Sequence, residues 1–388
     1  MLIQFTVENH RSIKNSAVIS FAASKDKSFE EYLLHPDEKK ALLPVLAIYG
    51  ANAAGKSNVL HAMMTMKEMV VGNAAKVSKG QKLPWEPFGG TKVPTSFEMV
   101  FIFQGVRYTY GFSFDAKKIY KEYLYHWPNG REALIFSREN GLYEFRENVN
   151  EQVTLSNRTP DNKLYLVSSN DWNLPQTENA YRWFLEKLSF LMDEEPATSE
   201  TVAQIAGGDD KKARILKELL LADLGITDVT IKNTSGKIPV ITTTHRIINE
   251  DGTTEYFQLL MQQESVGTQH FFARIGGWLK ALENGALLVV DEIEDSLHPL
   301  LTRRLIEMVQ DKAINTKGAQ LIFTTHDAML LDLNFFRRDQ IWFAEKNDET
   351  CATELYSLAS FSPRKGENVR KGYLQGRFGA IPFIGGDA

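Results

Sequence analysis

The 388-residue chain has a single cysteine, Cys351, and no long apolar run. One cysteine excludes an internal disulfide framework and a cysteine metal cluster, which indicates a reducing compartment. Because a helix needs roughly 20 mostly apolar residues to span a bilayer, the sequence predicts no transmembrane segment. The opening residues, MLIQFTVENHRS, lack the basic region and apolar core of a signal peptide. We therefore expect a soluble, cytoplasmic protein with no membrane partner.

A surplus of positive charge is also absent. The chain has 44 Lys and Arg against 49 Asp and Glu, which gives a formal net charge of −5. A nucleic-acid partner is therefore not implied by charge, although a local basic face could still bind one. The composition, 43% hydrophobic and 24% charged residues, is that of an ordinary globular protein. The length allows one large domain with an elaboration, or two domains.

Residues 50–57, GANAAGKS, match the phosphate-binding pattern G-x-x-x-x-G-K-[ST]. The apolar run LLPVLAIYG precedes them and SNVLHAMMTMKEMV follows, so the loop joins an expected strand to an expected helix. Glycines let the backbone curl until its N–H groups point at phosphates, and the helix N-terminus adds partial positive charge. Lys56 would place a point charge between the phosphates. Ser57 would offer its hydroxyl to magnesium.

The run LLVVDE at 287–292 places four apolar residues directly before two acids. A buried parallel strand has this pattern when it delivers carboxylates to the carboxyl edge of the sheet, where α/β proteins bind ligands. Asp291 is expected to hold magnesium, and Glu292 to polarise the water that attacks a γ-phosphate. Alone, the pair could be a solvated turn at a strand end. The phosphate-binding loop favours the catalytic interpretation.

The remaining segments predict the architecture. Short β-like runs at 2–7 and 17–22 predict paired strands around a loop that contains Arg11. From about 93 to 175, alternation predicts mostly antiparallel strands with one wet face. The aromatic residues of this region are interpreted mainly as a sheet core, with a base-stacking platform as the alternative. They are Tyr108, Tyr110, Phe112, Phe114, Tyr120, Tyr123 and Tyr125.

A compact helical insert is expected next, with helices at 177–193 and 211–224 joined by a loop or short helical turn. After 226 the pattern predicts further strands and then ESVGTQ at 264–269, where Ser265 precedes an amphipathic helix. The strand AQLIFTTHD ends near His326. The apolar face expected on the first insert helix consists of Tyr181, Phe184, Leu185, Leu188 and Leu191.

These pieces, in this order, resemble the ATP-binding-cassette (ABC) ATPases, and specifically the head domains of the SMC and OLD-like branch. The segments ESVGTQHFF, DEIEDSLHP, FTTHD, RRDQIWFAEK and GYLQGRFGAIPF are similar to the bacterial AAA15-type or abortive-infection ATPases, including the ATPase of PARIS antiphage systems. The resemblance implies an α/β ABC-ATPase head, with a P-loop NTPase sheet flanked by helices, an antiparallel β-subdomain and the helical insert. The division along the chain would be an N-terminal ATPase lobe at 1–175, the insert at 176–225 and a C-terminal ATPase lobe at 226–388.

The resemblance also implies ATP and Mg²⁺ as ligands and gives residues their roles. Glu292 would activate water and His326 would sense the γ-phosphate, while Ser57 and Asp291 would hold magnesium. The implied nucleotide-binding residues are Arg11, Gly50, Asn52, Ala53, Ala54, Gly55, Lys56, Ser57, Asn58, Ser265, Gly267 and Asp295.

One phosphate-binding loop and one signature motif per chain imply that two chains meet to complete each ATP site, in a homodimer or a larger oligomer. Ser265 and Gly267 would form the signature that reaches ATP on another copy, and Asp295 would match the D-loop along the seam. The signature reads ESVGTQ where transporters carry L-S-G-G-Q. Gln81 and Gln104 are the two candidates for the Q-loop glutamine.

On this resemblance we expect a sensor or regulator in bacterial antiphage defence. It would hold or release an effector encoded in the same operon, such as a TOPRIM-type nuclease or a toxin, in response to a phage-encoded trigger. The alternative is an SMC-like DNA-repair or DNA-tethering ATPase, against which stand the acidic charge and the missing coiled coil. An ABC transporter subunit is a weaker alternative, because such subunits lack the large β-rich segment.

Overall fold

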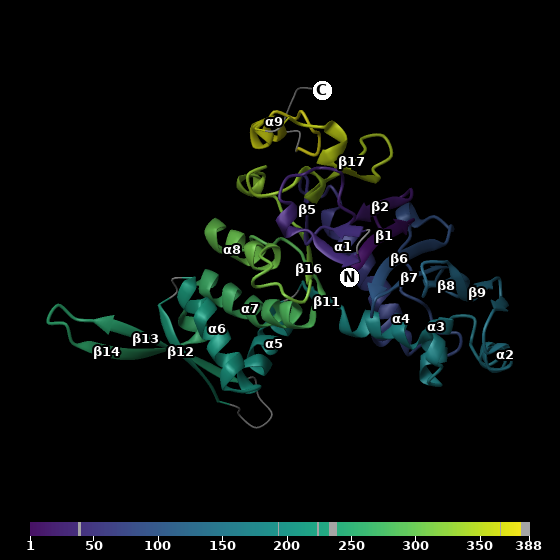
Figure 1. Cartoon of the computed structure of the whole chain (residues 1–388), viewed down its shortest axis with the longest axis horizontal. Coiled ribbons are helices and arrows are strands. Elements are labelled where there is room, and N and C mark those ends of the chain that lie inside the picture. Colours follow the sequence, from purple (N-terminus) through teal and green to yellow (C-terminus); the bar gives the residue numbers. More distant parts are fainter. Residues whose placement is uncertain (38–39, 193, 223–224, 233–238, 365, 382–388) are drawn as a thin grey trace.

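The computed structural model describes residues 1–37, 40–192, 194–222, 225–232, 239–364 and 366–381. Its helices and strands form two large sheets with helices between and around them, and a narrow projection extends from one side (Figure 1). In this part of the chain, no helix is both long and apolar enough to cross a membrane.

The core sheet has six strands in the order β11-β15-β16-β5-β17-β18. The first five are parallel, and β18 is antiparallel to β17. All residues of β5, β15 and β16 are buried, as the apolar runs predict. Their carboxyl ends therefore meet at one edge of the sheet. The strand bounds are Val45–Tyr49 for β5, Leu188–Leu191 for β11, Leu287–Val290 for β15, Gln320–Thr324 for β16, Ile341–Lys346 for β17 and Thr353–Ser357 for β18.

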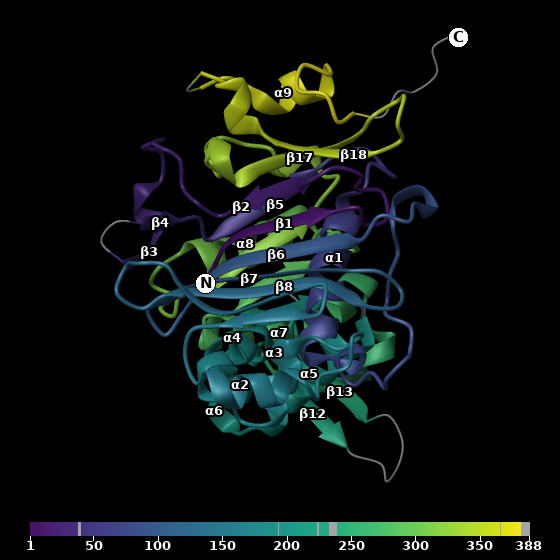
Figure 2. The same cartoon turned by 90° about the vertical axis from the view of Figure 1, so that its right-hand side faces the viewer.

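The second sheet has seven strands in the order β10-β9-β8-β7-β6-β1-β2, all paired antiparallel. Figure 2 shows β1, β6, β7 and β8 side by side. The predicted N-terminal strand pair and β-rich subdomain are thus one continuous sheet. The bounds are Leu2–Glu8 for β1, Ala17–Ser20 for β2, Thr95–Phe103 for β6, Val106–Phe114 for β7, Ile119–Trp127 for β8, Ala133–Glu139 for β9 and Leu142–Phe145 for β10.

The β pattern ends earlier than predicted, because helices α2 (Val149–Ser156) and α3 (Tyr165–Asp171) occupy most of the segment before residue 175. The first five residues of α3 are all buried, so their sequence has no wet face to mark a helix. The Glu122 carboxylate accepts hydrogen bonds from the first amides of this helix, at 2.7 Å from Tyr165 N and 2.9 Å from Leu166 N. This contact from β8 fixes a helix that the local pattern does not show.

Helix α1 (Lys56–Val71) lies between the two sheets. Its apolar side chains share a buried cluster with Leu46 and Ile48 of β5 and with the inner face of the antiparallel sheet. The alternate β5 residues, Val45, Ala47 and Tyr49, belong to a second cluster on the opposite face. The two-residue period of a strand thus covers both faces of the core sheet and anchors the start of α1 at its edge.

The segment expected to be a helical insert contains a strand of the core sheet. Helix α4 (Pro175–Glu186) ends before residue 193, and Leu188 and Leu191 lie on β11, beside β15. The predicted helix is therefore wrong after Glu186, because the apolar run LSFL pairs with a distant strand. Leu185 is exposed rather than part of an apolar face.

The predicted loop between the insert helices is also wrong in large part. Helix α5 (Glu194–Ala206) occupies it, followed by α6 (Asp209–Leu221) as expected. The Thr201 hydroxyl of α5 donates to the carbonyls of Phe272 and Ala273, at 2.8 and 2.9 Å, so that packing against another helix stabilises α5. Residues 193, 223 and 224 lie outside the described residues, and the three-part division of the chain stays a prediction.

Three antiparallel strands form the projection at the left of Figure 1. They are β12 (Ile226–Lys232), β13 (Val240–Ile248) and β14 (Thr254–Leu260), as the sequence predicts. We call residues 226–232 and 240–260 the arm. The remaining elements are β3 Leu34–Asp37, β4 Lys40–Leu42, α7 Val266–Asn284, α8 Pro299–Gln310, α9 Val369–Leu374 and the 3₁₀ helices η1 Glu30–Tyr32, η2 Asn73–Ala75, η3 Phe88–Gly90, η4 Met261–Gln263, η5 Ala328–Leu330, η6 Arg338–Gln340 and η7 Leu358–Phe361.

Candidate nucleotide-binding site

The GANAAGKS segment forms a tight loop between β5 and α1. Ala53 has a φ of 62° and Gly55 a φ of 96°, both in the left-handed region. A Cβ atom at Gly55 would overlap the Thr353 hydroxyl, so this position needs glycine for space as well as for conformation. No side chain caps the start of α1. The first amides of the helix are therefore available to an anion.

A cavity of about 380 Å³ lies at this loop. Six of its lining residues come from the phosphate-binding loop and the first turn of α1, and one comes from the loop after β15. They are Asn52, Ala53, Gly55, Lys56, Ser57, Asn58 and Glu292. The cavity thus joins the two motifs that the sequence places 234 residues apart, as the Ser57–Asp291 hydrogen bond also does.

Lys56 is buried, with 6% of its surface exposed. Its Nζ donates to the carbonyls of Gly50 at 2.9 Å and Ala51 at 3.1 Å, so the side chain curls back and closes the loop. Burial lowers the pKa of Lys56, while the nearby carboxylates of Glu292 and Asp291 oppose this shift. The Lys56 ammonium donates only to neutral carbonyls, so a triphosphate would give it a negatively charged partner. This favours anion binding here.

Asp291 and Ser57 form an oxygen pair next to the cavity. The Ser57 hydroxyl donates to Asp291 Oδ1 at 3.0 Å, and the Thr324 hydroxyl donates to the same oxygen. A hydroxyl and a carboxylate suit Mg²⁺, which usually completes its shell with water and substrate phosphate. Among the described residues there is no cluster of three or more His, Cys, Asp or Glu that could hold a metal by itself. These donors fit a nucleotide-bound magnesium, held by Ser57 and Asp291.

Glu292 has a backbone held in an uncommon conformation. Its φ is 44°, and its N–H donates to the Thr324 hydroxyl at 2.8 Å. Thr324 thus orients both acids, since its hydroxyl accepts from Glu292 N and donates to Asp291. The motif search missed Thr324, although it lies at the end of the predicted strand before His326.

A chain of hydroxyl groups supports the phosphate-binding loop from outside. The Thr353 hydroxyl donates to the Ala54 carbonyl at 2.9 Å and lies 2.7 Å from Ser12 Oγ. Ser12 Oγ also accepts from Asn58 Nδ2 at 2.7 Å. These contacts join the N-terminal loop, α1 and β18. Nothing local in the sequence marks Thr353, because its partner Ala54 lies 299 residues away.

Arg11 lies in the loop next to Ser12 with a φ of 48°. Its Nε donates to Glu86 Oε2 at 2.6 Å, and its backbone N–H donates to the Glu86 carbonyl at 2.8 Å. The hydrogen bond from the Arg11 side chain lowers the pKa of Glu86. Arg11 is therefore paired with an acid and does not line the cavity. Its contact with nucleotide stays a prediction.

Neither Q-loop candidate reaches the cavity. Gln104 occupies the exposed turn between β6 and β7, with a φ of 50°. Gln81 is exposed, and its Oε1 accepts from Ser78 N at 3.1 Å. Their position between two motifs in the sequence is the only feature that indicates them, and the fold places them outside the lining of the cavity.

The predicted signature segment lies at the start of α7, outside the lining of the cavity. Ser265 caps α7, accepting from Thr268 N at 3.1 Å, as the sequence predicts for an N-cap. Ser265 is exposed, and so is Val266, at 59%. A Cβ atom at Gly267 would lie 3.0 Å from the Ser296 carbonyl, so the signature contacts the segment that follows Glu292. Neither Ser265 nor Gly267 lines the cavity.

Asp295 is half-exposed and pairs with α7. Its Oδ2 lies 3.8 Å from Arg274 Nη2 and 3.5 Å from His270 Nδ1. Arg274 also donates to the carbonyls of Ile293 and Asp295, at 3.1 and 3.3 Å. The predicted D-loop is thus attached to the helix that carries the signature.

His326 follows β16 at the same edge of the sheet, but its side chain is 58% exposed. Its Nδ1 lies 3.0 Å from Glu294 Oε1, which also accepts from the backbone N–H of His326 at 2.7 Å. Glu294 therefore holds the loop that carries the histidine, a role that the sequence search did not assign. His326 does not line the cavity, so its contact with a γ-phosphate stays a prediction.

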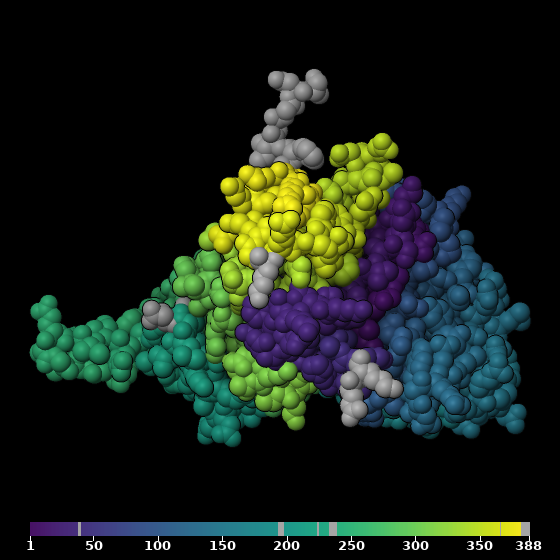
Figure 3. Space-filling view, turned by 45° about the horizontal axis from the view of Figure 1, so that its top comes forward, coloured from purple at the N-terminus to yellow at the C-terminus, as the bar shows by residue number. Residues whose placement is uncertain are grey.

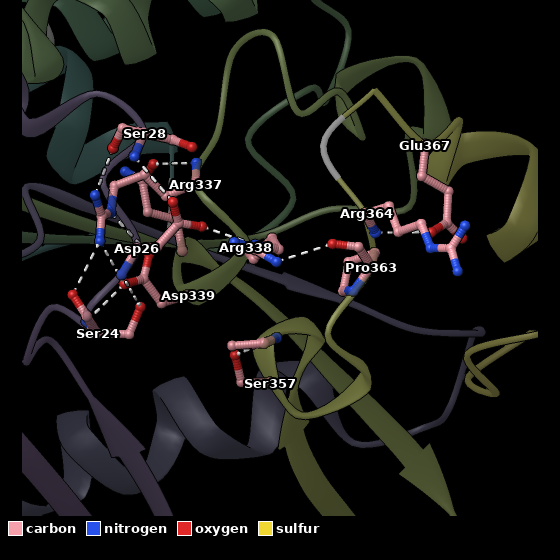
Figure 4. Close-up of polar contacts among 12 residues, drawn as sticks. Ser24, Asp26, Ser28, Arg337, Arg338, Asp339, Ser357, Pro363, Arg364 and Glu367 are labelled. Carbon is pink, nitrogen blue, oxygen red and sulfur yellow. Dashed lines mark hydrogen bonds and ion pairs between the residues drawn. The ribbon is translucent and has the colours of Figure 1, made fainter.

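A larger cavity, of about 820 Å³, lies between residues 26–31, 331–338, 363–364 and 366–370. Figure 4 shows that two of its arginines, Arg337 and Arg338, contact other parts of the protein. Arg337 donates to both Asp339 oxygens at 2.9 Å, and Arg338 donates to Asp26 at 2.7 Å and to the Pro363 carbonyl at 2.8 Å. Burial raises the pKa of Asp26, but hydrogen bonds from Arg338 and Ser28 outweigh it and lower the pKa to about 2. Arg337 and Arg338 thus hold three chain segments together, so the phosphate-binding loop remains the better candidate site.

A loop between a buried parallel strand and a helix, with a carboxylate pair beside it at the same sheet edge, defines a P-loop nucleotide-binding protein with an ABC-type α/β head. The comparison with protein families agrees. Residues 45–332 match the family described as "AAA domain, putative AbiEii toxin, Type IV TA system", and the chain belongs to this family.

Among solved structures, the chain is similar to the SMC head domain from Thermotoga maritima. The alignment has 12% sequence identity and a TM-score of 0.41, and it covers 92% of this chain and 98% of that chain. No curated protein matches the chain.

Proposed function

We propose that the protein hydrolyses ATP at sites completed between two copies of the chain, and that this switch controls an effector protein in bacterial antiphage defence. The observation that carries the proposal is the separation of two half-sites. Lys56, Ser57 and Glu292 line one cavity, whereas the exposed Ser265 and the nearby Gly267 do not line it. A second copy can bring its signature to the first copy's nucleotide.

The arrangement suits hydrolysis of the γ-phosphate. Lys56 and the amides at the start of α1 bind the phosphates, and magnesium held by Ser57 and Asp291 would neutralise charge as the leaving group departs. Glu292 accepts a proton from water, whose oxygen bonds to the γ-phosphorus as the bond to the β-phosphate oxygen breaks. The products are ADP and phosphate. Binding ATP would favour the assembled state, and hydrolysis would release it.

The regulatory role rests on the family and on what the described residues offer. The family's description names a toxin and a toxin–antitoxin system, which suits a chain that acts with a partner. The described residues contain no cluster of three or more metal-ligating side chains with which the chain could cut nucleic acid. We therefore propose that a separate effector, a TOPRIM-type nuclease or a toxin from the same operon, performs the damaging reaction after a phage-encoded trigger.

Mixing two inactive variants tests the shared site. Lys56→Ala removes the phosphate contact and Ser265→Arg blocks the signature, so each variant alone should lose ATPase activity. In a mixture, half of randomly formed dimers are mixed and each has one intact site, which predicts recovery of up to about a quarter of wild-type activity. Phosphate release from the mixture measures this. No recovery, with both variants folded, would contradict a site shared between copies.

Co-purification tests the regulatory role. The tagged chain is expressed with its neighbouring gene from the intact operon, and the partner is identified by mass spectrometry with wild-type protein and with Glu292→Gln. A partner whose retention changes between the two supports the proposal. An intact operon that gives no phage restriction, together with no captured partner, would contradict it.

DNA tethering by an SMC-like ATPase is the second candidate, and one surface favours it. On the solvent face of β7 and β8, the Arg107 guanidinium lies 4.4 Å from the Trp127 ring centre and Lys121 Nζ lies 5.4 Å from that of Tyr123. Paired rings and cations can stack bases and contact phosphates. Strong stimulation of the ATPase activity by DNA would favour this function over effector control, provided that the affinity for DNA falls steeply as the salt concentration rises.

A further inference from the structure

Glu264, the first residue of ESVGTQ, is a buried acid beside an exposed loop. Its side chain is 7% exposed, whereas the next two residues, Ser265 and Val266, are exposed. A carboxylate withdrawn from water needs partners, because its desolvation is otherwise unfavourable. The identity of those partners shows what the signature is attached to.

Both partners of the Glu264 carboxylate belong to the arm. Oε1 accepts from the Thr243 hydroxyl and lies 2.6 Å from His245 Nε2. Thr243 and His245 lie two residues apart on β13, so they share one face of the strand. The His245 ring stacks on Phe257 of β14, with 5.0 Å between ring centres and an angle of 19°. One carboxylate oxygen therefore ties the signature loop to two strands of the arm.

The segment that follows the Glu264 side chain is tied to helix α7. The Glu264 carbonyl accepts from Gln269 Nε2 at 2.8 Å. The adjacent Ser265 hydroxyl accepts from Thr268 N at 3.1 Å and lies 2.8 Å from Thr268 Oγ1. The short connection between arm and helix is thus held from both ends. Any displacement of β13 would pull on the residue that precedes the signature serine.

The arm is exposed enough to transmit such a displacement. Six of the seven residues of β14 are exposed, including Tyr256 and Phe257, and its sheet neighbour is β13. In Figures 1 and 3 the arm extends beyond the rest of the molecule. Its base is coupled to the signature through Glu264, while its outer strand faces solvent.

We infer that Glu264 is a positioning residue, through which the arm sets the signature serine against ATP bound on a second copy. This deepens the proposed function and rests on it, because it names the element that regulates the shared site. When β13 holds Glu264, Ser265 is presented for assembly. When β13 moves, the signature loosens while the phosphate-binding loop of the same chain keeps its own ligands.

The test compares Glu264→Ala with Glu264→Gln. Alanine removes the acceptor for both Thr243 and His245, whereas glutamine keeps an Oε1 that can accept from both. Glu255→Ala, an exposed acid on β14, is the matched control. Each substitution is also made together with Glu292→Gln, and ATP-driven assembly is measured by mass photometry over a range of protein concentrations. A fluorescent ATP analogue reports nucleotide affinity at the lowest concentration.

Glu264→Ala is expected to weaken ATP-driven assembly about tenfold, since two hydrogen bonds to a charged group are lost. Nucleotide affinity of the dilute protein should not change. ATPase activity should fall at low protein concentration and recover as concentration rises, which a merely structural defect would not produce. Glutamine should restore most of the assembly, and Glu255→Ala should behave as the parent.

Normal assembly by Glu264→Ala would overturn the inference. So would failure of glutamine to do better than alanine, or an equal loss of nucleotide affinity in the dilute protein. The mixture of Lys56→Ala and Ser265→Arg separates the two claims. If the mixture recovers ATPase activity and Glu264→Ala assembles normally, only the role of Glu264 is refuted. If the mixture recovers no activity, the shared site itself is refuted.

Discussion

The two halves of the candidate ATP site differ in how far contacts within one chain bury and hydrogen-bond their residues. On the phosphate-binding side, Lys56 is buried, Asp291 is fixed by Ser57 and Thr324, and Thr353 supports the loop. On the signature side, Ser265 is exposed at the start of α7. Contacts within one chain thus fix the residues of the first half, whereas the serine of the second half is exposed to solvent.

This difference has a physical basis. The phosphate-binding half must hold an ammonium out of water, and burial lowers the pKa of Lys56 even though carboxylates oppose the shift. Such a site is stable only when its surroundings are rigid and well hydrogen-bonded. An exposed serine at a helix N-terminus keeps no charge out of water, so it can remain accessible to an anion on another molecule. Substitutions on the two sides should therefore fail in different ways.

Glu292→Gln should have the largest effect. It removes the general base but preserves shape, so the turnover number should fall by about 10²- to 10⁴-fold, a loss typical for such groups. ATP binding should persist, and the assembled form should accumulate. Phosphate release and particle mass with ATP measure both. Hydrolysis at the wild-type rate would show that Glu292 is not the base.

Lys56→Ala should weaken ATP binding about 100-fold, because charge-assisted contacts with phosphate are lost. Titration with a fluorescent ATP analogue measures this, and no ATP-driven assembly should follow. Lys79→Ala, which removes an exposed lysine, is the control and should bind normally. Equal losses in the two variants would mean that general charge, rather than the loop, attracts the nucleotide.

Thr353→Val tests the outer support of the loop. It keeps the branched shape but removes the hydroxyl that donates to the Ala54 carbonyl. Losing one hydrogen bond of about 1 kcal/mol should weaken ATP binding roughly fivefold. Thr353→Ser, which keeps the hydroxyl, should stay near wild type. If both variants bind as the parent does, the loop keeps its shape without β18.

His10→Phe should leave activity at neutral pH unchanged and alter only acid stability. His10 is fully buried against Phe97, and its ring nitrogens have no hydrogen-bond partner in the described structure. Burial, with smaller contributions from Arg11 and His61, lowers its pKa from 6.5 to about 4, against the opposing charge of Glu86. The folded protein therefore keeps His10 neutral while the unfolded chain takes up a proton.

His10 should therefore not lower the free energy of unfolding above pH 6.5. As the pH drops from 6.5 toward 4, its effect should lower that free energy by up to about 3 kcal/mol. His10→Phe keeps an aromatic ring beside Phe97 and should flatten this part of the curve. Urea unfolding at pH 7, 5.5 and 4.5 measures it, with the exposed His35→Gln as control. An unchanged slope for His10→Phe would show that other groups cause the acid sensitivity.

Much of the candidate site could be predicted because its motifs are local. GANAAGKS lies between a strand and a helix, and LLVVDE is a buried strand followed by two acids. Parallel strands must end at a common edge, so the contact between Ser57 and Asp291 followed from the fold class. The N-cap Ser265 is also local and was predicted correctly.

Other features could not be predicted because their causes are distant. The run LSFL at 188–191 has the apolar spacing of a helix end, yet β15 makes it a strand. Helix α3 is buried along its first five residues, and its capping partner Glu122 lies more than 40 residues away, so the local sequence does not mark it as a helix. Only their position between two motifs indicates Gln81 and Gln104, and the order of residues along the chain says little about their distance in space.

The sequence by itself determined the phosphate-binding loop, the acidic pair and the buried strands that deliver them, since each depends on neighbours within a few residues. Only the tertiary structure decided that Thr353 supports the loop across 299 residues, that Thr324 orients both acids, and that Glu264 attaches the signature to the arm. A hydroxyl or carboxylate can bond to many partners. Which partner it meets depends on the packing of the whole chain.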